Sequence, residues 1–332
     1  MEIKKYKLTE ETINVYGITL HRIEALKDFA NIKKGDKGGY VEKKGNLSQS
    51  DDCWVFGNVV VFGNAVVCGN AKVYGDAKVC GDAKVYGKAK VLDNARISGN
   101  ARISGNAEVY DDAVVYGNAT IYGDAKVYRN AKVYGNARIC GNAKVYGNAM
   151  VYGNAKVYED ARIYGNTKVY HNAAVCGDAV VYCDAKVYGN AAVCGNTRIY
   201  GNAIVRGDAV VGGDAEIYDN AKVFGNTEVF GNAEICGDAE IASNSDYIVF
   251  KNWWSSGSYF TWTKNNNMWK VGCFYGTGEQ LIEKAYKDSE LSGKEYKKVV
   301  VYVNSIKANE YDHVRKNIKE RLLLKIRKLF GK

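Results

Sequence analysis

Apolar and polar positions alternate along most of this chain in a pattern that repeats every six residues. Val or Ile occupies every sixth position from Val55 to Ile241, thirty-two times without an insertion or a deletion. The unit reads Gly-Asn-Ala-Lys-Val-Tyr, and its last four residues alternate as in a strand, with Ala and Val on one side and Lys and Tyr on the other. Gly-Asn readily adopts positive φ, which predicts a turn after each short strand.

Three such sides would close a triangular coil of eighteen residues with Val and Ala inside. The turn glycines support this period independently, because eight repeats lack the glycine and five of these exceptions are separated by multiples of eighteen: Asp93, Asp111, Arg129, Cys183 and Asp219. One corner of the triangle should therefore differ chemically from the other two. The array predicts ten to eleven coils, about 50 Å long at a strand spacing of ~4.8 Å.

The unit Val-Tyr-Gly-Asn-Ala-Lys resembles that of the hexapeptide-repeat superfamily, with Val and Ala at the two inward positions. This resemblance spans about 200 residues. It implies an all-β solenoid, a left-handed triangular β-helix. The Tyr after each Val departs from the family, which commonly has Gly, Ala, Glu or Asp there. The chain is also similar to bacterial and prophage Gly-Asn-Ala-x-Val repeat proteins that are often labelled transferases, and so the resemblance implies a fold more than a chemistry.

A solenoid needs caps, because the strand edges at its open ends would otherwise pair with other chains. We therefore expect three regions: an N-terminal β cap over residues 1–44, the hexapeptide-repeat β-helix over 45–246, and a C-terminal α/β cap over 247–332. In the first region, Ile18 and Leu20 alternate with polar residues as in a strand.

The C-terminal region carries its own signals. Residues 260–263 and 268–271 flank three asparagines, which predicts a hairpin. Thr277 with Gln280 predicts a capping box that opens a helix. From Val314 to Lys332 the chain has eight basic residues and one acidic residue, with apolar residues on one helical face. This tail could lie on a membrane surface, bind nucleic acid or dock on a partner, or it could pack against the solenoid.

Composition indicates the cellular compartment of the protein but does not identify a reaction or a ligand. Six of the nine cysteines occur inside repeats where other repeats have Tyr, Phe or Ser, which favours reduced thiols over a disulfide framework. The N-terminal segment MEIKKYKLTEET has no apolar run, so we expect no signal peptide. No stretch approaches the ~20 apolar residues of a membrane span. A cytoplasmic protein is the simplest interpretation.

Candidate catalytic and metal-binding residues are scarce. Hexapeptide acyltransferases resemble one another in a catalytic His and in a loop that leaves the coils, whereas this array has no insertion and only His171, which replaces a turn glycine. The other histidines, His21 and His313, lie in different regions, which argues against a shared zinc site. Cys176 and Cys194, eighteen residues apart, could bind a metal or pair, but we interpret them as small groups filling one column. We expect no catalytic residue, no metal site and no cofactor.

Projection on eighteen residues reveals one face that is aromatic in nine of its eleven coils, and a column of cations lies beside it. The candidate ligand-binding residues on this face are Lys126, Tyr128, Lys144, Tyr146, Arg162, Tyr164, Arg198 and Tyr200. Surfaces that interleave cations with rings bind polyanions or stack bases. The alternatives are that stacked identical side chains only stabilise the solenoid, or that the face packs on a second copy.

These patterns predict a non-enzymatic β-solenoid scaffold or binding protein that forms a homo-oligomer. Its expected partners are nucleic acid, a nucleotide or another anionic ligand on the Tyr/Lys face. The alternative is an acyltransferase-like enzyme with an intersubunit active site.

Overall fold

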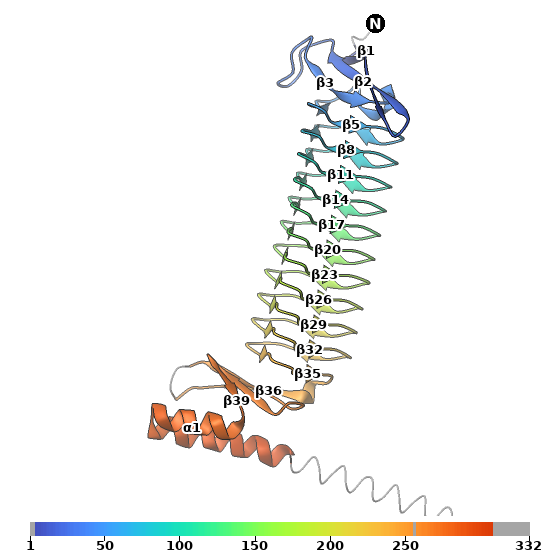
Figure 1. The fold of residues 1–332 in the computed structure, drawn as a ribbon. Coiled ribbons are helices and arrows are strands. Elements are labelled where there is room, and N and C mark those ends of the chain that lie inside the picture. The colour runs from blue at the N-terminus through green and yellow to red at the C-terminus, as the bar shows by residue number, and fades with distance from the viewer. Residues whose placement is uncertain (1–3, 255–256, 308–332) are drawn as a thin grey trace, which may run out of the picture. The chain divides into compact units, whose positions relative to one another are not determined.

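The computed structural model describes residues 4–254 and 257–307 of the chain. Two compact units divide between Asp246 and Tyr247 (Figure 1). The first unit holds the N-terminal strands and the repeats, and the second holds a small antiparallel sheet with helices. Each unit is described by itself below.

The repeats form thirty-two strands of two residues each, and each strand pairs in parallel with the strand eighteen residues further on, as Lys126 with Lys144 and Val127 with Val145. Three sheets result (Figure 1). The predicted solenoid of about eleven coils with mostly parallel sheets is therefore confirmed. The eleven-stranded sheet, which carries the Tyr/Lys face, consists of β4 (Trp54–Val55), β7 (Lys72–Val73), β10 (Lys90–Val91), β13 (Glu108–Val109), β16 (Lys126–Val127), β19 (Lys144–Val145), β22 (Arg162–Ile163), β25 (Val180–Val181), β28 (Arg198–Ile199), β31 (Glu216–Ile217) and β34 (Glu234–Ile235).

The other two sheets complete the triangle. The ten-stranded sheet consists of β6 (Val66–Val67), β9 (Lys84–Val85), β12 (Arg102–Ile103), β15 (Thr120–Ile121), β18 (Arg138–Ile139), β21 (Lys156–Val157), β24 (Ala174–Val175), β27 (Ala192–Val193), β30 (Val210–Val211) and β33 (Glu228–Val229). The fourteen-stranded sheet contains β5 (Val60–Val61), β8 (Lys78–Val79), β11 (Arg96–Ile97), β14 (Val114–Val115), β17 (Lys132–Val133), β20 (Met150–Val151), β23 (Lys168–Val169), β26 (Lys186–Val187), β29 (Ile204–Val205), β32 (Lys222–Val223) and β35 (Glu240–Ile241), together with the N-terminal strands β1 (Tyr6–Val15), β2 (Ile18–Ala25) and β3 (Lys37–Val41).

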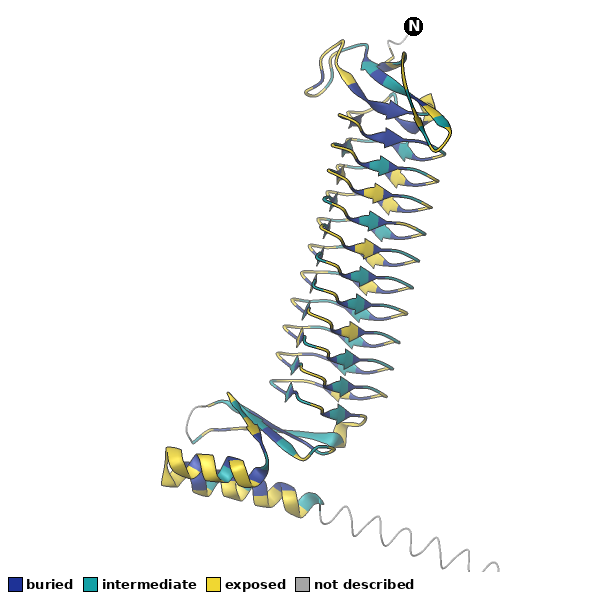
Figure 2. Cartoon of the chain, in the orientation of Figure 1, coloured by how far each residue is buried: buried dark blue, intermediate teal, exposed yellow. Residues whose placement is uncertain are grey.

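The core of the solenoid is a narrow column of small apolar side chains, and its buried positions recur in every coil (Figure 2). The inward Val and Ile residues are fully buried, and so are the inward Ala residues. Thr replaces Ala at Thr167, Thr197 and Thr227. Each of these hydroxyls donates to the carbonyl three residues earlier, at 2.6 to 2.8 Å. A buried hydroxyl is tolerated because its hydrogen bond is made within the turn.

The chemically distinct corner predicted from the missing glycines has a structural reason. Its turn residues have positive φ of 55° to 60° at Asp93, Asp111, Arg129, Cys183 and Asp219. The Asp111 carboxylate accepts from the Arg129 backbone N–H at 3.1 Å, and Asp93 and Asp219 accept likewise from the coil that follows each of them. These bonds to the next coil offset part of the strain that a side chain suffers in this backbone region.

The asparagines that follow the turn residue also stack. Six consecutive bonds run from Asn100 to Asp208, with each Nδ2 donating to the Oδ1 of the residue eighteen positions on at 2.8 to 3.0 Å. The ladder ends at Asp208 because a carboxylate accepts but cannot donate. Alternation of Asn and Asp in the sequence thus marks where each ladder stops.

The N-terminal strands close one end of the coils. A hairpin of β1 (Tyr6–Val15) and β2 (Ile18–Ala25) pairs with β3 (Lys37–Val41), which joins β5 in parallel. The strand predicted at Ile18 and Leu20 is β2. A short 3₁₀ turn, η1 (Lys44–Asn46), leads into the first coil. The Lys5 side chain is buried, and its Nζ donates to the backbone carbonyls of Ser50, Asp51 and Cys53 at 3.0 to 3.2 Å, which satisfies the ammonium.

The C-terminal unit begins after η2 (Asn244–Asp246) and is built from β36 (Tyr247–Lys251), β37 (Tyr259–Thr263), β38 (Met268–Val271), β39 (Phe274–Gly276), α1 (Gly278–Asp288) and a second helical segment over 290–307. The predicted hairpin is β37 with β38, and the predicted Thr277–Gln280 capping box opens α1; both predictions are confirmed. Phe260, Trp262, Trp269 and Leu281 form its core. Within the described residues, none of the helices combines the length and the apolar character that a membrane span requires.

Candidate anion-binding face of the solenoid

Seven tyrosines of the eleven-stranded sheet form a continuous stack, which we call the tyrosine ladder. Consecutive ring centroids lie 4.7 to 5.1 Å apart, and the ring planes differ by 1° to 13°. The ladder consists of Tyr110, Tyr128, Tyr146, Tyr164, Tyr182, Tyr200 and Tyr218. Its regularity follows from the parallel register, since equal positions in successive coils are separated by the strand spacing.

The stacking changes what the ladder can bind. Each ring covers the faces of its neighbours, and the fixed coil spacing leaves no room for a third ring between two tyrosines. Only ring edges and hydroxyls of the inner rings remain for a ligand. The expectation that bases stack on this face therefore does not apply to the interior of the ladder, although the face can still offer hydroxyl donors.

These hydroxyls stay protonated near neutral pH. Burial raises the pKa of Tyr110 to about 12. Burial also raises the pKa of Tyr146, and the nearby Arg162 and Arg129 oppose that rise.

The cation column consists of Lys126, Lys144, Arg162 and Arg198. At both of its ends, the positive charge is paired with a carboxylate of the same chain. Lys126 Nζ lies 2.8 Å from one carboxylate oxygen of Glu108, and Lys90 Nζ lies 3.1 Å from the other. Arg198 forms an ion pair with Glu216 at 2.8 Å, and the Tyr200 hydroxyl donates to the same carboxylate. Two of the predicted binding cations, Lys126 and Arg198, are thus already paired.

The middle of the column is different. Among the described residues, no carboxylate lies within ion-pair distance of Lys144, Arg162 or Arg129, which we call the cation cluster. Arg129 stands at the distinct corner, and its Cζ lies 5.8 Å from the centroid of the Tyr146 ring. The nearest acid along this corner is Asp111, which accepts from the Arg129 backbone N–H rather than from its guanidinium. Val180 follows Arg162 in the column and ends the cluster.

Sequence reasoning missed Arg129 as a member of this site. It recorded Arg129 only as an exception to the turn glycine. The available signal was its place directly after Tyr128, which puts its side chain beside the ladder. A second signal was a cation at a left-handed turn position, where Gly, Asn or Asp costs less strain.

A second stack of five rings, Tyr116, Tyr134, Tyr152, Tyr170 and Tyr188, follows the fourteen-stranded sheet at spacings of 4.7 to 4.9 Å. His171 lies beside this stack at a left-handed turn, and its ring meets Tyr170 edge-on at 4.8 Å. His21 is far from it in β2, where Nδ1 contacts the carbonyl of Thr9. His313 and the basic segment 314–332 lie outside the described residues.

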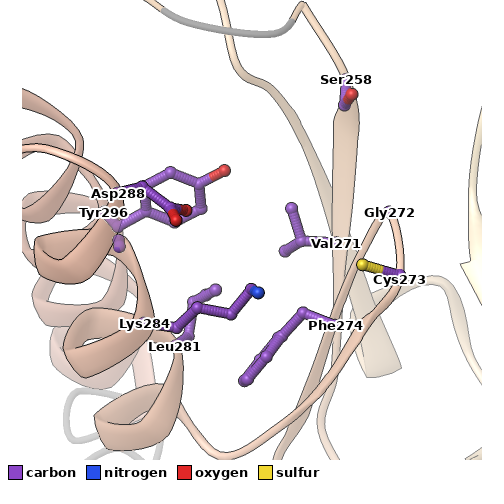
Figure 3. A pocket seen from close by; sticks show the side chains of 10 residues that line it. Ser258, Val271, Gly272, Cys273, Phe274, Leu281, Lys284, Asp288 and Tyr296 are labelled. Carbon is purple, nitrogen blue, oxygen red and sulfur yellow. The ribbon is translucent and has the colours of Figure 1, made fainter.

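The C-terminal unit contains a cleft of about 250 Å³ between its sheet and α1 (Figure 3). Val271, Phe274 and Leu281 form an apolar wall, and Lys284 and Asp288 bring opposite charges one helical turn apart on α1. These residues lie outside every candidate predicted from the sequence. In the part of the chain that the structure describes, no group of three or more His, Cys, Asp or Glu residues is placed to hold a metal ion.

Comparison with known families supports the β-solenoid repeat and does not assign an activity or a ligand. A family model described as the YdcK β-solenoid repeat matches residues 95–111, 101–117, 143–159 and 197–213. The repeat is similar to that of YdcK. The four matched segments lie inside the coils and cover less than half of the chain. The segment at 143–159 includes Lys144 and Tyr146. No curated protein matches the chain. Kinship with the wider hexapeptide-repeat superfamily stays a prediction.

Proposed function

We propose that this protein is a non-enzymatic β-solenoid scaffold that binds a polyanion at the cation cluster beside Tyr146. One observation carries the proposal. Arg129, Lys144 and Arg162 have no carboxylate partner in the described structure, while Lys126 and Arg198 in the same column are paired within the chain. An uncompensated cluster between Lys126 and Arg198, whose charges are paired within the chain, favours an external anion.

The chemistry of the cluster favours phosphate or sulfate groups. Guanidinium groups bind the oxygens of such anions through two parallel N–H bonds, and lysine adds a point charge. The Tyr146 hydroxyl supplies a neutral donor beside Arg129, whose Cζ lies 5.8 Å from the centroid of its ring. Affinity then comes from charge and counterion release rather than from base stacking, so the site should prefer charge density over base identity.

The test measures binding of a labelled oligothymidylate by fluorescence anisotropy across a series of salt concentrations. The variant Arg129→Gly/Lys144→Ala/Arg162→Ala should bind at least about tenfold more weakly, and its salt slope should fall by about 2, since each single-strand phosphate contact contributes ~0.7. Glycine at position 129 also removes the strain of its positive φ.

The matched control is Lys132→Ala/Lys168→Ala/Lys186→Ala, which removes the same charge beside the second tyrosine stack. Its binding should change much less. Equal loss in both triple variants would show a diffuse charge effect and overturn the site, as would absence of binding by the parent protein at low salt. Inorganic polyphosphate should compete with the oligonucleotide, because bases contribute little.

Homo-oligomerisation, and binding of the basic tail to a membrane surface or to nucleic acid, stay predictions of the sequence. Sedimentation velocity with the full chain would test the first of them.

A further inference from the structure

Cys176 and Cys194 occupy the same position in neighbouring coils of the ten-stranded sheet. Their strands pair in register, Ala174 with Ala192 and Val175 with Val193. The Cys176 N–H donates to the Val193 carbonyl at 2.9 Å, and the Cys194 N–H makes the equivalent bond one coil later. No other two cysteines of the chain are eighteen residues apart.

The two thiols lie on the outward side of the sheet and are half-buried. Tyr158 occupies the same position one coil before Cys176, and the Cys194 thiol donates to the Val211 carbonyl with Sγ and O 3.7 Å apart. Beyond Cys194 the column continues with Gly212, where an added Cβ would lie 2.5 Å from the Phe230 ring and 3.3 Å from the Cys194 sulfur. The dithiol therefore lies between Tyr158 and Gly212, whose place in the column is covered by the Phe230 ring.

The spacing of the coils decides what such a pair can do. Equivalent Cβ atoms in stacked coils are ~4.8 Å apart, whereas a disulfide requires about 3.5–4.5 Å. A metal ion with bonds of ~2.3 Å to sulfur holds two sulfurs roughly 3.8 Å apart at a tetrahedral angle. Parallel side chains reach that separation by small rotations, while a disulfide would need the coils to distort.

We propose that Cys176 and Cys194 form a chelating site for a soft, thiophilic divalent metal ion on the outer face of the solenoid. Binding forms two metal–sulfur bonds and releases both thiol protons, so that two thiols and one M²⁺ give one M(SR)₂ unit and two H⁺. No oxidant takes part. Water would complete the coordination of the ion. This site is separate from the cation cluster, which lies on another sheet.

Proton competition should control the affinity. Because both thiols must lose a proton, the apparent affinity should rise with pH by up to about a hundredfold per unit while both are protonated.

The experiment titrates Cd²⁺ into the reduced full-length protein that carries Cys183→Ser and Cys273→Ser, which removes the two exposed single thiols. Thiolate–cadmium charge-transfer absorbance should appear with one ion per chain. Cys176→Ser and Cys194→Ser should each weaken binding at least tenfold, because one thiol cannot chelate. Unchanged thermal unfolding of these variants shows that the coils are intact, and the same column already accepts Ser104.

The matched control is Cys140→Ser, a cysteine in the same column whose neighbours one coil away are Tyr122 and Tyr158. It should leave cadmium binding unchanged. Equal weakening in the control, persistence of the band in Cys176→Ser, or absence of a band in the parent overturns the proposal. Incubation with glutathione disulfide should produce no Cys176–Cys194 disulfide, and rapid formation of that bond would refute the geometric argument.

Discussion

The solenoid and the C-terminal unit solve the same packing problem in opposite ways. In the solenoid, a residue meets its own kind eighteen positions away, so that Val packs on Val, Tyr on Tyr and Asn on Asn. In the C-terminal unit, unlike residues from β37, β38 and the helices gather around Phe260 and Trp269. The difference teaches that repetition spreads stability over many small equal contacts, whereas the small unit concentrates it in a few large side chains.

The largest expected effect is a break of the repeating core. Val145→Asp places an unpaired carboxylate at a fully buried position, in a column without space or a polar partner. We expect a loss of about 4 kcal/mol or more in the free energy of unfolding. Thermal unfolding followed by circular dichroism measures it. Lys144→Asp, one residue away on the outer surface, should be close to neutral, and equal damage from both changes would contradict the assignment of inner and outer positions.

Trp269→Ala tests the concentrated core of the C-terminal unit. Trp269 is almost fully buried against Phe250 and Phe260, so its removal should cost about 3–5 kcal/mol. Differential scanning calorimetry should show a lower transition temperature for this unit and an unchanged transition for the solenoid. A single transition that shifts as a whole would mean that the two units unfold together.

Asn154→Ala should have a smaller effect, because it removes two hydrogen bonds from the middle of an exposed asparagine ladder. We expect a loss of about 1–2 kcal/mol by chemical denaturation. Asn130→Ala is the control, since the structure shows no ladder bond at that position. If the two variants are equally stable, the ladders contribute nothing beyond the turn itself.

The smallest effect concerns the balanced end of the cation column. Hydrogen bonds from Lys126 and Lys90 hold the pKa of Glu108 below its usual value. A lowered pKa in the folded state means that this stabilisation is present above the ordinary carboxyl pKa and is lost as pH falls through the folded value. Because both lysines are exposed and solvent screens the ion pairs, the parent and Glu108→Gln should differ by less than about 1 kcal/mol at neutral pH and converge in acid. A difference that grows in acid would reverse the assigned sign.

Much of the site could be predicted from the sequence, because residues eighteen positions apart lie side by side in neighbouring coils of a solenoid. Positions eighteen apart identify the tyrosine ladder, and the same rule would have paired Lys126 with Glu108 and Arg198 with Glu216. Applied to the rings, the ~4.8 Å coil spacing would also have shown that their faces are covered. Arg129 was out of reach of that rule, because its approach to Tyr146 crosses from a corner to a neighbouring coil.

By itself, the sequence determined the period of six, the triangular coil, the inward Val and Ala columns, and the hairpin and capping box of the C-terminal unit. These features depend on contacts that are either local in the sequence or strictly periodic. The periodic contacts recur in every coil, and the local ones involve residues only a few positions apart. Tertiary structure alone decided that Lys5 is buried against three carbonyls of the first coil and that the Arg129 side chain approaches the Tyr146 ring of the next coil. Such contacts depend on where a single side chain turns in space, and a residue that occurs once leaves no periodic pattern to read.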